Sequence, residues 1–250
     1  MDHPYRDLPI LPSREFSREG TRAVPIEDCG EPLVSASLVP ERMLARPQYY
    51  FQMIEGAVPE IFVRRSVLAR LLGASSFLPP GCRLILLYGW RSRTLQTALF
   101  QRFRSELRKK MPLLDDQEIV ALVSHFVAPP SLGAESPSPH FTGGSVDVTV
   151  ADESGICLNM GAEFDETTER SGTRFYEARL ELRERMSTAD MEALHNRRLL
   201  HAVMSRAGFT NYPGEWWHFD YGNQNWAFLK GQETALYGAS SPSFRWGSLS

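Results

Sequence analysis

The sequence predicts an α+β fold in which helices pack beside a mostly antiparallel sheet. Segments with apolar residues at helical spacing alternate along the chain with short runs, typical of strands, that are apolar throughout or strictly alternating. The chain has 250 residues, 42% of them hydrophobic, which is enough to bury one good-sized core. This length makes a single domain of residues 1–250 the default expectation, although it also fits two small domains, and no internal repeat is visible.

Four segments carry the helical spacing and predict helices. They span residues 61–72, 95–111, 115–126 and 190–207. The first is amphipathic, with Arg64, Arg65 and Arg70 mostly away from its apolar side. The second carries a basic cluster, which we interpret as a solvated helix face because the chain as a whole is acidic. The cluster consists of Arg102, Arg104, Arg108, Lys109 and Lys110.

Three other segments predict the strands of the sheet. Residues 84–87 form a short apolar run after a Pro-Pro-Gly turn, as expected of a buried strand. Residues 145–150 alternate valines with polar residues, so Asp147 points away from the valine face. Residues 215–221 are rich in aromatic residues and bounded by glycine, which favours a strand.

The two ends of the chain lack clear periodicity. Residues 1–48 are rich in proline and charge, which predicts an extended arm that wraps the domain. Residues 238–250 are expected to form a loose C-terminal tail. The internal segment 128–139 reads APPSLGAESPSP and is predicted to be a loop.

The charge balance argues against two classes of partner. Lys and Arg total 27 against 30 Asp and Glu, so no basic excess exists to bind nucleic acid or an anionic membrane. Residues 1–12 lack the apolar stretch of a secretory signal, and no segment approaches the roughly 18 apolar residues of a membrane span. Three widely spaced cysteines fit no disulfide framework. We therefore expect a cytoplasmic protein without a nucleic-acid or membrane partner, and the sequence does not indicate its oligomeric state.

Two of the six histidines are candidates for chemistry, because His140 and His218 lie where a loop meets a strand. His140 precedes Asp147 across a Gly-Gly turn, and Glu215 precedes His218 in an ExxH arrangement. Taken alone, the first pattern also fits an ordinary loop histidine and a solvated aspartate on a strand. The ExxH arrangement alone also occurs often by chance. Together, two histidines and one aspartate make a three-ligand zinc site with an open position. Glu215 is then the extra carboxylate that takes a proton from water.

These segments resemble the signatures of a known family. Residues 138–147 (SPHFTGGSVD) match the pattern SxHxxGxxxD. Residues 215–228 (EWWHFDYGNQNWAF) look like the second signature of the D-alanyl-D-alanine dipeptidases, a branch of the LAS zinc peptidases. The order of motifs is also similar, with an arginine after a buried strand and an MGxxFD segment at residues 160–165. The similarity runs from about residue 61 to residue 228 and is tight only in these patches.

The resemblance implies one zinc ion per chain, with His140, Asp147 and His218 as ligands. It implies Glu215 as the general base, which takes a proton from water and gives it to the departing amine. It also implies an arginine that stabilises the transition state, and we expect this arginine to be Arg91.

The surroundings of Arg91 depart from the family pattern. Gly-Tyr-Arg-Pro is usual at this place, whereas residues 89–92 read GWRS and are followed by a second candidate, Arg93. Arg91 keeps the position after the glycine and an aromatic residue, so it is the first choice. The departure puts the shape of the pocket and the dipeptide preference in doubt, and residues 48–58 also match the family poorly.

The activity that the resemblance implies is hydrolysis of D-alanyl-D-alanine, or a closely related D,D-dipeptide, to free amino acids. A free dipeptide needs its ammonium group bound, and Asp165 is our candidate, with an ordinary loop carboxylate as the alternative. Ser138 either contacts the substrate or caps its loop. Two other functions are a zinc D,D-carboxypeptidase or endopeptidase acting on peptidoglycan, and a zinc-stabilised binding module without catalysis. Glu215 favours catalysis, because a binding module is expected to lose the base.

Glu215 and His218 are three residues apart, so a regular strand places them on opposite faces. Both must nevertheless reach the metal. We therefore expect Glu215 to lie in the turn after residues 212–214, or at a bulge. Trp217 and Phe219 are then expected to point into the core while His218 points into the cleft.

Overall fold

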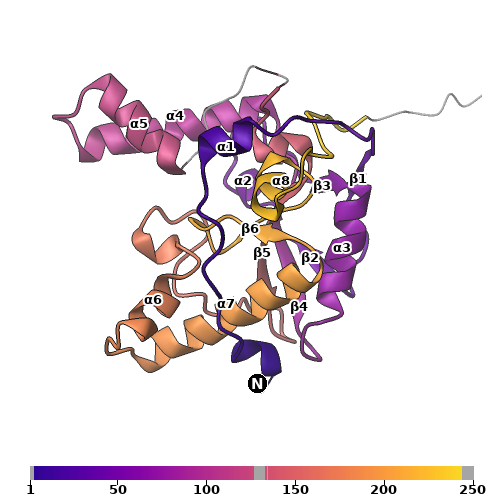
Figure 1. The fold of residues 1–250 in the computed structure, drawn as a ribbon, viewed down its shortest axis with the longest axis vertical. Helices are drawn as coiled ribbons and strands as arrows, with labels where there is room; N and C mark the ends of the chain where they lie inside the picture. Colours follow the sequence, from indigo (N-terminus) through magenta and orange to yellow (C-terminus); the bar gives the residue numbers. More distant parts are fainter. Residues whose placement is uncertain (1–2, 127–132, 134, 244–250) are drawn as a thin grey trace, which may run out of the picture.

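The computed structural model describes residues 3–126, 133 and 135–243 (Figure 1). Within them, helices surround a mostly antiparallel sheet, which is the α+β class that the sequence predicts. Among these residues, no helix is both long enough and apolar enough to cross a membrane.

The main sheet has its strands in the order β2-β4-β5-β7-β6. They are β2 (Met43–Ala45), β4 (Arg83–Tyr88), β5 (Ser145–Ala151), β7 (His218–Asp220) and β6 (Thr210–Asn211). β2 runs parallel to β4, and the other neighbours are antiparallel. In a separate two-stranded sheet, β1 (Leu33–Ser35) pairs with β3 (Phe62–Arg64) in antiparallel fashion.

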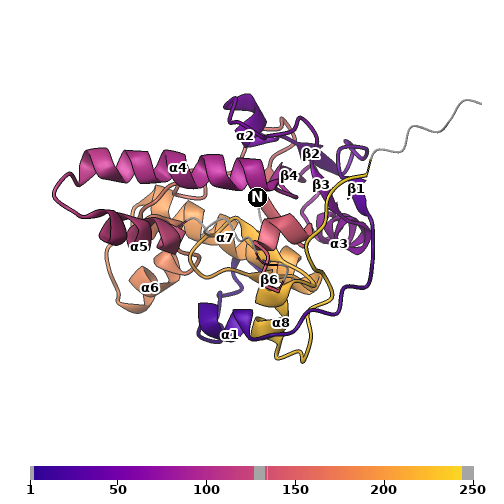
Figure 2. The same cartoon turned by 90° about the horizontal axis from the view of Figure 1, so that it is seen from above.

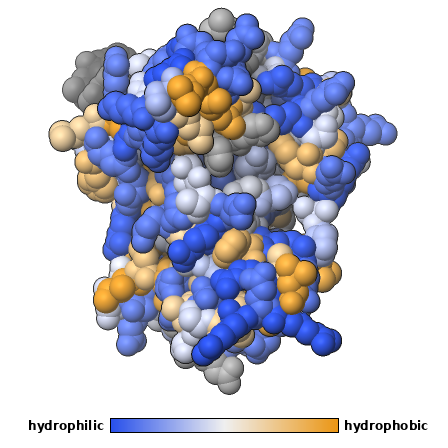
Figure 3. Space-filling model, turned by 90° about the vertical axis from the view of Figure 1, so that its left-hand side faces the viewer, coloured by the Kyte–Doolittle hydropathy of each residue, from blue (hydrophilic) through white to orange (hydrophobic). Residues whose placement is uncertain are grey.

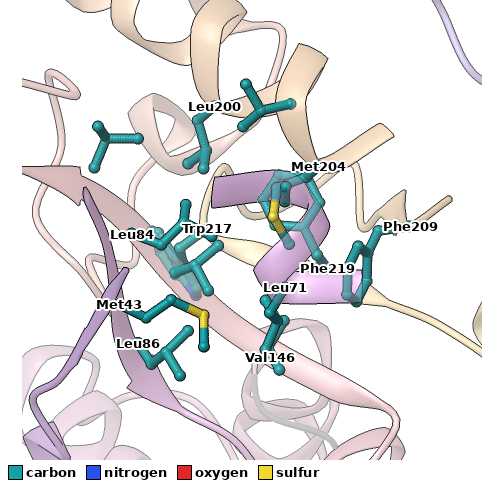
Figure 4. Close-up of a cluster of buried hydrophobic side chains, with 14 of the residues drawn as sticks. Met43, Leu71, Leu84, Leu86, Val146, Leu200, Met204, Phe209, Trp217 and Phe219 are labelled. Carbon is teal, nitrogen blue, oxygen red and sulfur yellow. The ribbon is translucent and has the colours of Figure 1, made fainter. Parts of the chain in front are cut away.

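Two helices, α3 (Arg65–Ser75) and α7 (Thr188–Arg206), cover one face of the main sheet. Their apolar side chains meet those of β4, β5 and β7 in the largest core cluster, part of which Figure 4 shows. The three valines of β5, Val146, Val148 and Val150, all belong to this cluster. The alternation of β5 therefore directs Asp147 to the opposite face of the sheet, as the sequence predicts.

The remaining helices lie around this framework. They are α1 (Arg18–Arg22), α2 (Gln48–Phe51), α4 (Arg93–Lys110), α5 (Asp116–Phe126), α6 (Phe175–Glu181) and α8 (Gln224–Lys230), with 3-10 helices at Pro4–Arg6, Pro139–Thr142 and Glu169–Ser171. The pair α4 and α5 forms a hairpin that projects from the sheet, as Figure 2 shows. One side of α4 lines a cleft.

The segment predicted as an extended arm contains short elements joined by extended chain. Its β2 is the edge strand of the main sheet, and its α1 packs beside α8. The arm is tied to the domain where the backbone N–H of Ile10 donates to Glu177 at 2.9 Å. Near the other end of the chain, Trp90 Nε1 donates to the carbonyl of Ser240 at 2.7 Å. Residues 244–250 of the predicted tail lie outside the described residues.

The predicted helix at residues 61–72 begins with a strand, because Phe62–Arg64 pairs with β1 and the helix proper is Arg65–Ser75. Arg64, predicted to lie away from the core, is only 2% exposed. Its guanidinium donates to the carbonyls of Thr142 and Gly238 at 2.8 and 2.9 Å. A pairing between distant segments therefore overrides the local helical pattern.

The predicted strand at residues 215–221 is also shorter, and β7 spans only His218–Asp220. The backbone N–H of Glu215 donates to the carbonyl of Tyr212 at 3.1 Å, which closes a turn before the strand. Glu215 therefore lies outside the regular pairing, in the turn where we expected it.

Candidate active site

Three elements bring His140, Asp147 and His218 together on the sheet face opposite α3 and α7. Asp147 in β5 and His218 in β7 are direct partners in the antiparallel register. His140 lies in the 3-10 helix Pro139–Thr142, which ends at Gly143 with a φ of 73°. A Cβ at position 143 would lie 2.1 Å from a side-chain atom of β1, so the turn requires glycine.

The polar atoms of these three buried side chains meet at one point. His140 Nε2 and His218 Nδ1 lie 3.2 Å apart. The two Asp147 oxygens lie 3.2 Å from His218 Nδ1 and 3.4 Å from His140 Nε2. One ligand atom from each residue lies within 4.8 Å of the other two, so the group is able to hold a metal ion.

Hydrogen bonds on the outer side of each imidazole decide which nitrogen faces this point. His140 Nδ1 donates to the carbonyl of Gly89 at 2.7 Å, and His218 Nε2 donates to Asp220 at 3.1 Å. Metal-binding histidines are commonly oriented in this way. The inner nitrogens and the Asp147 carboxylate form a donor set of two nitrogens and one carboxylate, which suits zinc. The residues present therefore fit a zinc ion.

The electrostatics of the three side chains favour a positive charge at the centre. Burial would raise the pKa of Asp147, but His140 and His218 hold it well below its usual range. Burial would lower the pKa of His218, but Asp220 and Asp147 raise it well above its ordinary value. A metal ion at the centre would displace the inner proton of His218, as metal binding to protonated ligands generally does.

Glu215 lies beside this centre. Its Oε2 is 3.7 Å from His218 Nδ1, so both side chains reach the same side of the sheet although they are three residues apart. His218 lines the cleft and Phe219 belongs to the buried core cluster, as predicted, whereas Trp217 belongs to that cluster and also lines the cleft. Burial, helped by the charges of nearby carboxylates, raises the pKa of Glu215 to about 8.

Arg91 follows β4 and its buried guanidinium enters the same space. Its Nη2 lies 3.7 Å from the Asp147 carboxylate, and its Nη1 donates to Gln96 at 3.1 Å. Its Nε is buried without a hydrogen-bond partner among the described residues, so one donor of the guanidinium is unsatisfied. The other candidate, Arg93, is exposed, and its guanidinium lies 5.1 Å from the ring centroid of Phe141 rather than lining the cleft.

Asp165 and Ser138 line the cleft as well. Asp165 adopts a left-handed backbone conformation with a φ of 66°, and burial raises the pKa of its carboxyl despite the nearby Arg91. Asp165 also hydrogen-bonds Tyr49, whose ring centroid lies 5.2 Å from the Arg91 guanidinium. Ser138 Oγ donates to Gln96 at 3.4 Å. The structure thus gathers all seven residues singled out in the sequence around one cleft.

The sequence did not point to three further residues of the site, Tyr49, Gln96 and Asp220. Asp220 follows His218 by two residues and shares its strand face, so alternation along the strand offered a usable signal. Tyr49 in α2 and Gln96 in α4 belong to no motif. Only the folded chain brings them to Asp165 and Arg91.

The cleft that contains these residues has a volume of about 650 Å³, within the range of roughly 300–1,000 Å³ that is usual for ligand sites. The histidine and aspartate centre lines this cleft together with residues of α1 and α4. Figure 3 shows the side of the molecule from which α4, α5 and α6 project. Hydrophilic side chains predominate on this face, and the apolar ones form small separate groups.

The sequence is similar to those of known proteins. A Peptidase_M15 family model described as D-ala-D-ala dipeptidase matches residues 61–234. The chain is 31% identical over 223 residues to the D-alanyl-D-alanine dipeptidase of Synechocystis sp., covering 84% of this chain and 90% of that protein. It is 39% identical over 83 residues to the D-alanyl-D-alanine dipeptidase of Escherichia coli, covering 33% of this chain and 37% of that protein.

The matched family and the gathered site together define a metallopeptidase. The chain belongs to the D-ala-D-ala dipeptidase family of M15 peptidases. The resemblance noted in its two signatures is thereby confirmed, while the roles of the individual residues are proposals.

Proposed function

We propose that the chain is a zinc-dependent dipeptidase that hydrolyses D-alanyl-D-alanine to two molecules of D-alanine. The observation that carries the proposal is the meeting of His140, Asp147 and His218 at one buried point, with both imidazoles oriented from outside. These three side chains would hold one zinc ion per chain. The names of the two relatives support the substrate.

Glu215 is the proposed general base. When bound at the centre, zinc supplies a Lewis acid and lowers the pKa of water to about 7. Glu215, 3.7 Å from His218 Nδ1, is placed to take a proton from the attacking water and to hand it to the departing amine. A cation at the centre lowers the raised pKa of Glu215, so the carboxylate is available as a base near neutral pH.

Arg91 is the proposed donor to the oxyanion that forms during the attack. Its Nε carries an N–H without a partner among the described residues, and loss of one oxyanion donor typically costs about 2.7–4 kcal/mol of transition-state stabilisation. The guanidinium is held in place, because the ring centroids of Tyr49 and Tyr88 lie 5.2 and 5.5 Å from it and Gln96 accepts one of its hydrogens. A fixed donor stabilises the oxyanion without first reorganising.

Asp165 is the proposed partner of the substrate ammonium group, and Ser138 contacts the dipeptide backbone. Burial raises the pKa of Asp165, and an ammonium group beside it would lower this pKa and form an ion pair. The acidic loop thus recognises the amino end of the dipeptide, while Arg91 and the metal centre act on its peptide bond.

We place this activity in the cytoplasm and in the metabolism of cell-wall peptidoglycan. All three cysteines are free thiols, and Cys29 and Cys157 are exposed, which fits a reducing compartment. A D,D-dipeptide points to peptidoglycan as its source, because proteins synthesised on ribosomes are built from L-amino acids.

A panel of dipeptides tests the substrate. Purified protein is supplied with zinc and incubated with D-Ala-D-Ala, L-Ala-D-Ala and L-Ala-L-Ala, and the free alanine is measured. We expect release from D-Ala-D-Ala and little from the L,L-dipeptide. Preferential hydrolysis of L-Ala-L-Ala would contradict the proposed substrate, and hydrolysis of none of the three would contradict the proposed activity.

A further inference from the structure

The turn of residues 212–218, called the Glu215 turn here, carries the proposed base outside the regular pairing of the sheet. The backbone N–H of Glu215 donates to the carbonyl of Tyr212 at 3.1 Å, and the N–H of His218 donates to the carbonyl of Glu215 at 3.3 Å. Among the described residues, the Glu215 carboxylate accepts no hydrogen bond, and its ion-pair contact is with His218 Nδ1 at 3.7 Å. The place of this carboxylate therefore depends largely on the backbone of the turn.

The side chain of Asn211 in β6 holds both ends of the ExxH segment in this turn. Its Nδ2 donates to the carbonyl of Glu215 at 3.0 Å and to the carbonyl of His218 at 2.9 Å. A side-chain amide nitrogen carries two hydrogens, so both bonds can form at once. Asn211 is buried and does not line the cleft, so its amide reaches the site through the backbone of the turn rather than through the substrate.

Thr173 fixes the orientation of this amide. A carbonyl can only accept, so the nitrogen of Asn211 faces the turn and its Oδ1 faces the buried Thr173, whose Oγ1 donates to it at 2.5 Å. The backbone beside Thr173 runs along the same turn. Thr173 N–H donates to the carbonyl of Pro213 at 3.0 Å, and Trp216 N–H donates to the carbonyl of Ser171 at 2.9 Å. A buried amide with its oxygen and both hydrogens bonded is held in one orientation.

The Glu215 turn does not need Asn211 in order to form. The carbonyl of His218 also accepts from the N–H of Tyr212 at 3.1 Å, and the carbonyl of Glu215 accepts from the N–H of His218. Both carbonyls therefore keep a backbone partner when the amide is removed. What the amide adds is a restraint across the turn, from the strand β6 to the residue that carries the base.

We propose that Asn211, with Thr173 behind it, is a positioning residue that holds the Glu215 carboxylate beside the metal centre. This inference rests on the proposed function, in which Glu215 is the general base. A base must lie within hydrogen-bond reach of the proton that it takes, and a misplacement of about 1 Å can cost roughly 100-fold in rate. Because Asn211 contacts no substrate, the loss is expected in kcat rather than in KM.

Asn211→Ala tests this role in the zinc-loaded protein with D-Ala-D-Ala as substrate. We expect kcat to fall about 10-fold to 100-fold, while KM and the zinc affinity, measured by competition with a chelator, change by less than about twofold. Thr210→Ala is the matched control in the same strand, because the Thr210 hydroxyl donates to the carbonyl of Asp220 at 3.4 Å, outside the Glu215 turn. This variant should keep the wild-type kcat.

A pair of substitutions at Thr173 tests the same role without removing the amide. Thr173→Val keeps the shape of the side chain and removes the hydroxyl, whereas Thr173→Ser keeps the hydroxyl. We expect Thr173→Val to lower kcat about 3-fold to 10-fold, because Asn211 Oδ1 loses its donor and the amide can turn, and Thr173→Ser to restore most of the rate. This pair decides the question if Asn211→Ala fails to fold.

Three results would overturn the inference. An unchanged kcat in folded Asn211→Ala would limit the amide to a structural role. A weakened zinc affinity or a raised KM without a fall in kcat would show that the amide serves His218 or the substrate instead of Glu215. An equal loss in Thr173→Ser and Thr173→Val would show that the hydroxyl does not orient the amide. Absence of D-Ala-D-Ala hydrolysis by the wild-type protein would instead contradict the dipeptidase proposal.

Discussion

His140 Nε2 and His218 Nδ1 lie 3.2 Å apart, and each imidazole donates its other N–H to an oxygen outside the centre. Two lone pairs cannot face each other at this distance together with a buried carboxylate unless a cation or a proton lies between them. The relationship between these two nitrogens is therefore the strongest structural sign of a metal site in the chain.

Removal of one ligand should release the metal. We expect His140→Ala to lose its zinc on dialysis, while the wild-type protein keeps about one zinc per chain, because two remaining ligands bind too weakly. Metal content is measured by elemental analysis after dialysis. His195→Ala, which changes a histidine of α7 outside the cleft, is the control. Full zinc occupancy in His140→Ala would remove this residue from the ligand set.

Loss of the outer hydrogen bond of His218 should weaken metal binding without abolishing it. Asp220 is buried and accepts from His218 Nε2, so Asp220→Asn changes the charge that orients the imidazole and favours its inner lone pair. We expect zinc affinity to fall about 10- to 100-fold, as is usual for such partners. Competition with a chelator measures the change. Unaltered affinity would mean that Asp220 serves only to satisfy buried Ser145, Asn223 and Asn225, the other side chains that donate to its carboxylate.

Substitutions of the two neighbouring arginines, Arg91 and Arg93, should differ sharply in their effect on kcat. We expect Arg91→Ala to lower kcat by about 100-fold to 1,000-fold, because it removes an oxyanion donor from a buried site. Arg93→Ala should change kcat little, because Arg93 is exposed and packs over Phe141. Steady-state kinetics with D-Ala-D-Ala separates the two. The opposite ranking would transfer the role to Arg93.

Arg197 should position the loop that carries Asp165. Its guanidinium is 2% exposed and donates to the carbonyls of Met160, Arg170 and Gly172 at 2.7, 2.6 and 2.7 Å. A lysine at this place cannot hold three carbonyls in the same fixed geometry. We expect Arg197→Lys to lower kcat/KM about 10-fold to 100-fold, mainly through KM, by displacing the loop. Circular dichroism checks that the variant is folded, and unchanged kinetics in a folded variant would limit Arg197 to a structural role.

The metal-free protein should show the raised pKa of Glu215 as a pH-dependent stability. The folded pKa of about 8 lies above the ordinary value of 4.5, so the folded protein binds an extra proton between these two pH values. The contribution of Glu215 to stability is therefore fully present below about pH 4.5, falls as the pH rises above it, and is lost by about pH 8. Glu215→Gln cannot ionise and avoids this loss.

Thermal unfolding in the presence of a chelator measures this difference. Glu215→Gln and the wild-type protein should melt at similar temperatures at low pH, whereas the variant should melt several degrees higher at pH values above 8. If the wild-type protein and Glu215→Gln melt at the same temperature at high pH, burial does not raise the pKa of Glu215.

The sequence predicted the α+β class and the centre because both depend on local patterns. Alternation in β5 put Asp147 on the correct face, and the three-residue spacing of Glu215 and His218 required the turn that the structure contains. Motif spacing, together with the resemblance to a known family, thus predicted where the polar side chains would meet. It gave no information about Tyr49, which reaches Asp165 from a segment that matches no signature.

The differences arise where distant segments interact. Phe62–Arg64 was predicted to be helical, but it pairs with β1, almost thirty residues earlier in the chain. Arg102 and Lys110 are exposed, in keeping with the interpretation as a solvated face, but they also line the cleft, which their spacing on the helix does not show. Local periodicity indicates which residues share a face of a helix or strand. It does not indicate which distant segments pack against that face after folding.

The most direct test of the central claim is a zinc titration of chelator-treated protein with D-Ala-D-Ala hydrolysis as the readout. We predict that the metal-free protein is inactive, that activity rises in proportion to added zinc, and that it saturates at one zinc per chain. Glu215→Gln should bind the same amount of zinc without regaining activity. Hydrolysis of D-Ala-D-Ala by rigorously metal-free protein, or full activity in zinc-loaded Glu215→Gln, would contradict the account.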